Sequence, residues 1–283
     1  MGIITYQLHN SIRTDYTGFK QLFKLYHDLK EHYNRHIFLD FETLEWIDAN
    51  LSSVFESILY KLKKENHLEF SANIDIVADK FHVLLRNGFI TFDNEATLFD
   101  ERKSTVPCRS FLPLEKEDFK TYIESDLLNH RGLPDSLTSN QRRRIKVDLL
   151  EIFSNVYQHA LTEDPFFVCG QYFPKEKLLK FTMSDLGCGF LPPIRDFSNN
   201  DIETDIDAIR WALSGKSIKP VNDEPAGCGL SGIHDYCNEY EGNFQIVSGE
   251  AFWGLDLEHT IFKGSRGFDK PIIGTTVNIF FKC

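Results

Sequence analysis

Strand-type and helix-type hydrophobic patterns alternate along the first part of the chain, and this alternation restricts the folds that it can adopt. Short apolar runs typical of strands occupy residues 3–8, 36–41 and 68–74. Apolar side chains recur at helical spacing in residues 19–33, 51–62 and 77–85. Strands that alternate with helices indicate an α/β domain, which we place at residues 1–95.

Local signals suggest where the elements of this domain begin and end. Asp48 or Asn50 precedes the second helix and has a side chain suited to capping it. Residues 96–115 show no clear period and contain Pro107 and Pro113, so we predict that they form a connection.

The remaining residues, 116–283, begin with helices and continue with strands. Thr138-Ser-Asn-Gln141 matches a capping box at the start of a long amphipathic helix. Residues 166–172 and 178–183 read as a hairpin, and residues 244–248 and 275–280 as further strands. We expect a layered α/β sandwich whose sheet is mixed or antiparallel, and we take a mixed sheet as the working prediction. The whole chain is then α+β in class.

The charge of the chain argues against nucleic acid as a partner. The 283 residues carry a formal net charge of -11, whereas phosphate neutralisation requires clustered lysines and arginines. The dense basic cluster, Gln141–Arg144, is more simply explained as the solvated start of a helix. We expect no nucleic-acid partner.

The sequence also predicts a cytoplasmic protein that does not enter a membrane. No run approaches the roughly 20 apolar residues that span a bilayer, and the N-terminus lacks the pattern of a secretory signal. The six cysteines form no Cys-x-x-Cys pair, which favours reduced thiols.

A carboxylate and a carboxamide lie one helical turn apart on the long helix, at Glu151 and Asn155. An amide oxygen is a suitable ligand for Mg²⁺, and a carboxylate one turn away can orient or deprotonate an attacking water. Such a pair also occurs on many solvated helices, so the chemical interpretation needs the other motifs.

Asp185, Gly187 and Gly189 follow the strand 178–183. A carboxylate at a strand end can accept a hydrogen bond from an exocyclic amine, which favours adenine over guanine. The glycines would let the backbone pass close to the base. A simple turn is the alternative.

Gly227-Cys-Gly229-Leu230-Ser-Gly232 runs directly into a helix. Backbone N–H groups at such a helix start form an anion site. The motif is neither a Walker A sequence nor a Rossmann turn. The long polar stretch 194–225 before it suggests a lid, and Lys216 within it is placed to reach a phosphate, although an exposed lysine is the simpler reading.

In this order, the motifs resemble the signatures of the GHKL ATPases, which share the Bergerat fold. Glu151 and Asn155 match the N-box, Asp185 to Gly189 the first glycine box, and Gly227 to Gly232 the second. Gly274-Thr275 before the last strand matches the terminal Gly-Thr. The resemblance implies that ATP and Mg²⁺ are the cofactors, that Asn155 holds Mg²⁺, that Asp185 contacts adenine and that Glu151 is the catalytic base. It also assigns Leu230 and Thr275 to the nucleotide site.

Residues 1–95 are similar to STAS domains, the class of the anti-sigma-factor antagonists of bacteria. Residues 38–41, 46–48 and 83–89 carry this similarity. The family often has a phosphorylatable serine after Ile-Asp, but Ala49-Asn50 stands there in this chain. Ser52 and Ser53 read as ordinary helix residues.

The resemblances imply either an ATPase or a serine protein kinase similar to the anti-sigma kinases, with its nucleotide controlling protein contacts. The alternative is a regulatory module that binds ATP without hydrolysing it, and a structural protein with a degenerate pocket is more distant. No histidine lies in a phosphoacceptor helix pair ahead of the domain, which disfavours a histidine kinase. We expect a protein partner through the STAS-like domain or the lid, and consider a homodimer.

Overall fold

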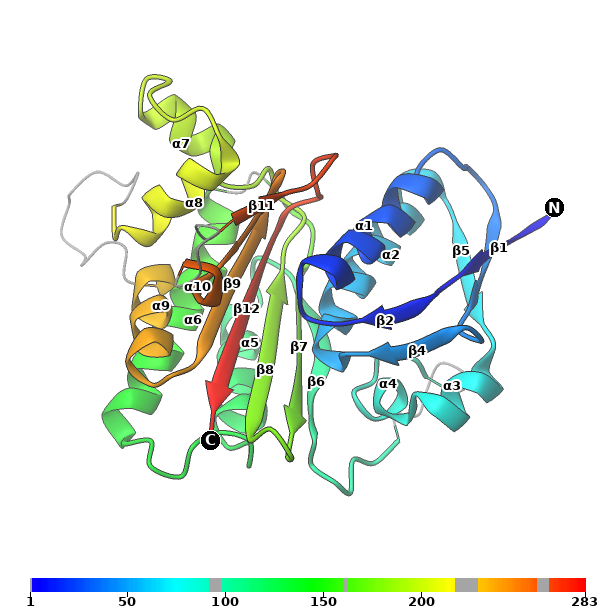
Figure 1. The fold of residues 1–283 in the computed structure, drawn as a ribbon, viewed down its shortest axis with the longest axis horizontal. Helices are drawn as coiled ribbons and strands as arrows, with labels where there is room; N and C mark the ends of the chain where they lie inside the picture. The colour runs from blue at the N-terminus through cyan, green and yellow to red at the C-terminus, as the bar shows by residue number, and fades with distance from the viewer. Residues whose placement is uncertain (1, 92–97, 160–161, 217–228, 259–264) are drawn as a thin grey trace.

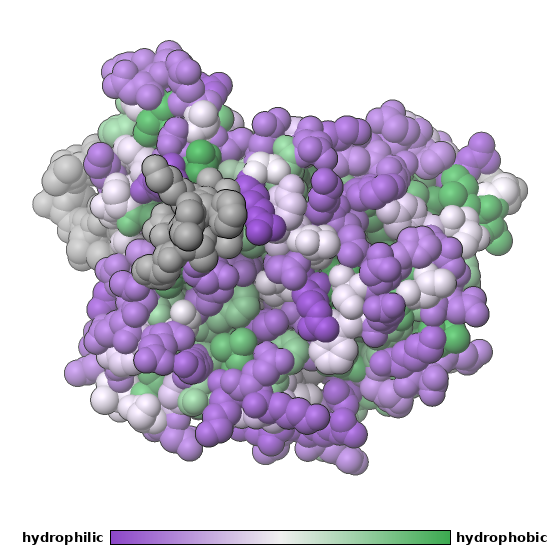
Figure 2. All heavy atoms as spheres, in the orientation of Figure 1, coloured by the Kyte–Doolittle hydropathy of each residue, from purple (hydrophilic) through white to green (hydrophobic). Residues whose placement is uncertain are grey.

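The structure, a computed structural model, describes residues 2–91, 98–159, 162–216, 229–258 and 265–283. Its helices combine with several β-sheets (Figure 1), so the predicted α+β class is confirmed. No helix in these ranges is long and apolar enough to cross a membrane. The face drawn in Figure 2 is mostly hydrophilic, with small hydrophobic areas scattered across it.

The N-terminal half contains a three-stranded parallel sheet of order β1-β3-β5 and a two-stranded parallel pair, β2-β4. The strands are β1 (Ile3–Gln7), β2 (Asn10–Ile12), β3 (His36–Asp40), β4 (Leu44–Ile47) and β5 (Glu69–Ala72). The helices are α1 (Tyr16–Leu29), η1 (Ala49–Leu51), α2 (Ser52–Asn66), α3 (Ile74–Lys80) and α4 (His82–Arg86). Gly88, with φ of 82°, follows α4 in the left-handed region.

The C-terminal half is built on a seven-stranded sheet of order β11-β10-β9-β12-β8-β7-β6. Its strands are β6 (Thr105–Phe111), β7 (Phe166–Phe173), β8 (Leu178–Ser184), β9 (Asn243–Ser248), β10 (Ala251–Gly254), β11 (Ser265–Gly267) and β12 (Thr275–Lys282). Every neighbouring pair among these strands is antiparallel. The working prediction of a mixed sheet is therefore wrong for the described strands. Short hairpins such as β7–β8 and β9–β10 impose antiparallel pairing.

The predicted connection 96–115 contains a strand of this sheet. β6 pairs with β7 at the sheet edge, and its register shifts between Val106 and Arg109. Pro107 lies in this irregular stretch, where a missing backbone N–H is tolerated. The irregularity explains why no clear strand pattern is visible in the sequence.

Helices cover one face of the seven-stranded sheet (Figure 1). They are α5 (Lys116–Tyr122), the π-helix η2 (Ile123–Leu127), α6 (Ser139–His159), α7 (Leu191–Phe197), α8 (Asp205–Leu213), α9 (Gly229–Glu239) and α10 (Leu255–Glu258). The capping box before α6 is confirmed. Gln141 Oε1 accepts a hydrogen bond from Thr138 N at 2.8 Å, and Thr138 Oγ1 accepts one from Gln141 N at 3.3 Å.

The N-terminal half covers the opposite face of this sheet, mainly through α2 and η1 (Figure 1). Successive side chains of β8 point to opposite faces of the sheet. Leu179, Phe181 and Met183 belong to the core shared with α6 and α9, whereas Lys180 and Thr182 point to the N-terminal half. Both faces of the sheet are thus buried.

A polar layer joins the two halves around Asp48, which is fully buried. Its carboxylate accepts from Lys180 Nζ at 2.8 Å and from the backbone and hydroxyl of Thr14, each at 2.8 Å. Asn50 donates to Thr182 Oγ1 at 2.7 Å. Neither Asp48 nor Asn50 caps a helix through its side chain, so that prediction is wrong. Their side chains bind residues far along the chain instead.

Candidate nucleotide site

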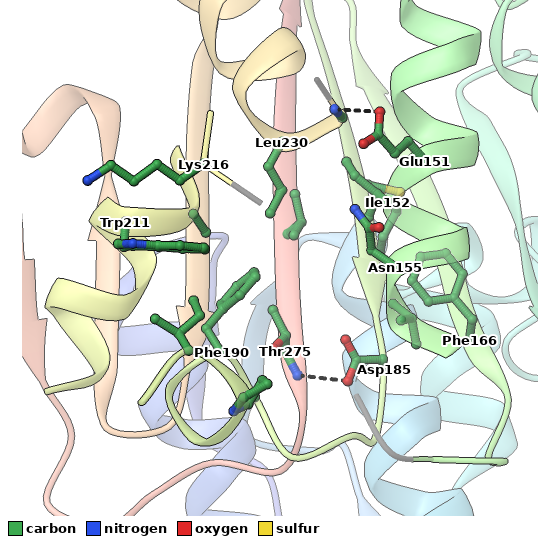
Figure 3. Close-up of a pocket in the computed structure, with 18 residues that line it drawn as sticks. Glu151, Ile152, Asn155, Phe166, Asp185, Phe190, Trp211, Lys216, Leu230 and Thr275 are labelled. Atoms are coloured by element: carbon green, nitrogen blue, oxygen red, sulfur yellow. Dashed lines mark hydrogen bonds between the residues drawn. The ribbon is translucent and has the colours of Figure 1, made fainter. Parts of the chain in front are cut away.

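A pocket lies on the helix-covered side of the sheet, between α6, α8 and the start of α9 (Figure 3). Its volume is about 130 Å³. Most of the residues singled out from the sequence line it, namely Glu151, Asn155, Asp185, Gly189, Lys216, Gly229, Leu230 and Thr275.

Asp185 lies directly after β8 with only 5% of its surface exposed. Its Oδ1 accepts hydrogen bonds from Gly187 N at 2.7 Å and from Thr275 N at 3.2 Å. Burial raises the pKa of this carboxyl group to about 6, although both backbone donors act in the opposite direction. At neutral pH it is mainly ionised, so the carboxylate can accept a hydrogen bond from a ligand amine.

Glycine is required at two positions around Asp185. Gly274 has φ of 64°, and a Cβ there would lie 1.9 Å from the backbone oxygen of Asp185. Gly189 has φ of 80°, and a Cβ there would lie 2.9 Å from Ser248 Oγ. Gly187 does not line the pocket. It holds the Asp185 carboxylate through its N–H group instead.

The wall formed by α6 carries Glu151 and Asn155. Apolar neighbours on the same helix, including Ile152 and Phe153, pack into the core and orient it. In Figure 3 Asn155 lies between Glu151 and Asp185 along this wall. The separation of Glu151 and Asn155 along the helix axis is about 6 Å, since each residue adds about 1.5 Å. A carboxylate, an amide and a second carboxylate thus lie one after another along the pocket.

The first turn of α9 packs directly on α6. Gly229 N donates a hydrogen bond to Glu151 Oε2 at 2.9 Å, and Leu230 lines the pocket. Gly232 does not line it. A Cβ at Gly232 would lie 2.5 Å from Asp148 Oδ2, so this glycine permits close packing of the two helices. Gly227 lies outside the described residues.

The wall opposite α6 was only partly recognised from the sequence. Phe190, Ile194 and Trp211 line it (Figure 3). They come from α7, α8 and the turn before α7, within and beside the stretch 194–225 that we expected to form a lid. Nothing in the sequence indicates that Trp211 on α8 lies across the pocket from Asp185 and Asn155 (Figure 3). Lys216 is exposed at the pocket edge.

The oxygen atoms of the pocket would suit a magnesium ion that binds together with a phosphate-bearing ligand. Among the described residues, no group of three or more His, Cys, Asp or Glu side chains could hold a metal. Mg²⁺ commonly takes one or two protein oxygens and completes its shell with phosphates and water. The amide oxygen of Asn155 fits such a site, and metal affinity there would depend on the bound phosphates.

No protein-family model matches this chain, and no curated protein or solved structure matches it. The functional assignment therefore depends on the motifs and on the geometry of the pocket.

Proposed function

We propose that this chain binds Mg-ATP in the α6–α9 pocket and acts as a GHKL-type ATPase or as a serine protein kinase similar to the anti-sigma kinases. One observation supports this most. Residues chosen from widely separated sequence motifs line a single pocket, including Glu151, Asp185, Gly229 and Thr275.

In the proposed complex, the exocyclic amine of adenine donates a hydrogen bond to the Asp185 carboxylate. The base lies between the α6 wall and the apolar side chains of Phe190 and Trp211. Asn155 holds Mg²⁺, and the triphosphate runs toward the N-terminal end of α9, where the helix dipole favours negative charge. Glu151 accepts the proton of the attacking water or hydroxyl group. The Lys216 side chain extends away from Glu151 in Figure 3 and would have to turn inward to add a positive charge near the phosphates.

A regulatory module that binds ATP without hydrolysing it is the second candidate. The hydrogen bond from Gly229 N to Glu151 Oε2 favours it, because this bond engages the carboxylate that catalysis requires. ADP formation by the pure chain distinguishes an ATPase from this module, whereas a kinase would form ADP only when its protein acceptor is present.

Ser52 and Ser53 are poorly placed to act as the phosphoacceptor of a kinase. Ser52 and Ser53, in the STAS-like half, are fully buried, and Ser52 Oγ accepts a hydrogen bond from Asn87 Nδ2 at 2.9 Å. A protein partner would bind through the lid or through the outer surface of the STAS-like half. We place the protein in the cytoplasm, where ATP is abundant and thiols stay reduced.

Thermal unfolding with and without nucleotide tests the proposal. A ligand at about a hundred times its dissociation constant adds roughly 2.7 kcal/mol to the free energy of unfolding. We expect Mg-ATP to raise the melting temperature and Mg-GTP to raise it less, because the 6-oxo group of guanine cannot donate to Asp185. The absence of a shift with Mg-ATP at millimolar concentration would contradict the proposal.

A further inference from the structure

One buried carboxyl group beside the pocket has no part in the proposed chemistry. Asp148 lies on α6 about one turn before Glu151 and is 2% exposed. Its Oδ2 atom has no hydrogen-bond partner among the described residues. A buried carboxylate oxygen without a hydrogen bond is costly, and carboxyl groups in such environments cluster at functional sites.

The carboxyl group of Asp148 lies directly beneath the first turn of α9. A Cβ built on Gly232 would lie 2.5 Å from its Oδ2 and 2.6 Å from its Oδ1. Gly229, one turn earlier, would meet the backbone oxygen of Asp148 at 3.0 Å and Glu151 Cβ at the same distance. Asp148 therefore contacts the helix end at which the proposed triphosphate would bind, without lining the pocket itself.

The charges that face Asp148 come from both helices. Burial raises its pKa to about 7; Arg144 lowers the pKa, and the negative charges of Glu151 on α6 and Asp235 on α9 raise it further. The Arg144 Nε atom is 3.9 Å from Oδ2 and its side chain is 58% exposed, so it neutralises the carboxylate only weakly.

We infer that Asp148 is a positioning residue that couples nucleotide binding to the uptake of a proton, an inference that rests on the proposed function. A triphosphate at the start of α9 brings further negative charge close to this carboxyl group. The bound state then favours the neutral acid, so Asp148 takes a proton from solvent on binding and returns it on release. Because linkage is reciprocal, the affinity for Mg-ATP falls as pH rises.

Calorimetric titration of Mg-ATP between pH 7 and pH 8.5 tests this coupling. For one linked proton, the dissociation constant of the wild-type protein rises by at most about tenfold per pH unit. Asp148→Asn keeps the shape of the side chain and removes its charge, so its affinity should be nearly constant over this range. Glu239→Gln is the matched control, because it removes an exposed charge from α9 that does not act on Asp148, and it should retain the pH dependence of the wild type.

Two further measurements keep the outcomes distinct. In the wild-type protein at pH 7.5, titrations in buffers of different ionisation enthalpy should show net proton uptake, and this result requires no variant. Without nucleotide, the free energy of unfolding of the wild type should fall as pH rises from about 4 to 7. In that window the unfolded carboxyl group has lost its proton and the folded one retains it. Asp148→Asn should show a smaller decrease, because Asp185, whose pKa is also raised, still contributes to it.

Equal pH slopes in wild type and Asp148→Asn, or no proton uptake by the wild type, would overturn the coupling while leaving ATP binding intact. If neither protein binds Mg-ATP but their unfolding still differs with pH, the proposed function fails, and the coupling fails with it. The burial of Asp148 would then remain as a structural property alone.

Discussion

Replacing Glu151 with Gln is expected to reduce ATP turnover by about 10²- to 10⁴-fold, the usual effect of losing a general base. The amide oxygen of Gln can still accept the hydrogen bond that Gly229 N donates to Glu151 Oε2. The packing of α6 against α9 should therefore persist, and the affinity for Mg-ATP should change little. Phosphate release under single-turnover conditions, together with a binding titration, measures the two effects separately.

The control for this experiment is Glu239→Gln, which makes the same chemical change at an exposed position of α9. It should leave both turnover and affinity unchanged. A Glu151→Gln protein that hydrolyses ATP at the wild-type rate would show that Glu151 is not the base. A wild-type protein that binds ATP but forms no ADP would exclude the ATPase and leave the regulatory module or a kinase that requires its acceptor.

Replacing Lys180 with Met is expected to reduce the free energy of unfolding by about 3–5 kcal/mol, because it leaves the buried carboxylate of Asp48 without its ionic partner. Lys180 Nζ lies 2.8 Å from Asp48 Oδ2 and 4.5 Å from the ring centroid of Phe173. Burial alone would raise the pKa of Asp48, but the charge of Lys180 and the hydrogen bonds from Lys180, Trp46 and Thr14 hold it below its usual value. Urea denaturation at pH 7 measures the loss.

Two comparisons separate this ion pair from ordinary surface charge. Lys282→Met breaks an exposed pair with Glu241 and should cost far less than Lys180→Met. Adding Asp48→Asn to Lys180→Met should recover part of the loss, since no buried charge then lacks a partner. Because folding lowers the pKa of Asp48, its contribution is present above the unfolded value of about 4 and is lost as pH falls below it. A loss below 1 kcal/mol for Lys180→Met would contradict this account of the layer between the two halves.

Local patterns in the sequence predicted much of the fold. The capping box at Thr138 and Gln141 and the β7–β8 hairpin depend on near neighbours, and both are present. β6 was missed because its edge position tolerates Pro107 and a register shift, which remove the strand pattern. Asp48 was misread as a cap because its true partner, Lys180, lies on the other half of the chain.

Contacts between residues far apart in the sequence also limited the prediction of the pocket. Each motif could be recognised locally, and the structure brings most of the chosen residues together. The roles of Gly187 and Gly232 could not be predicted, because one binds the Asp185 carboxylate and the other makes room for Asp148. Asp148 was not singled out from the sequence. Its side chain is buried by α9, which lies much further along the chain than α6.

A crystal structure with a non-hydrolysable ATP analogue and Mg²⁺ tests the central claim most directly. The account predicts the adenine amine within hydrogen-bond distance of Asp185 and a magnesium ion coordinated by the Asn155 side chain. The phosphates should extend toward the first turn of α9. An analogue that binds elsewhere on the molecule, with the α6–α9 pocket empty at saturating concentration, would contradict it.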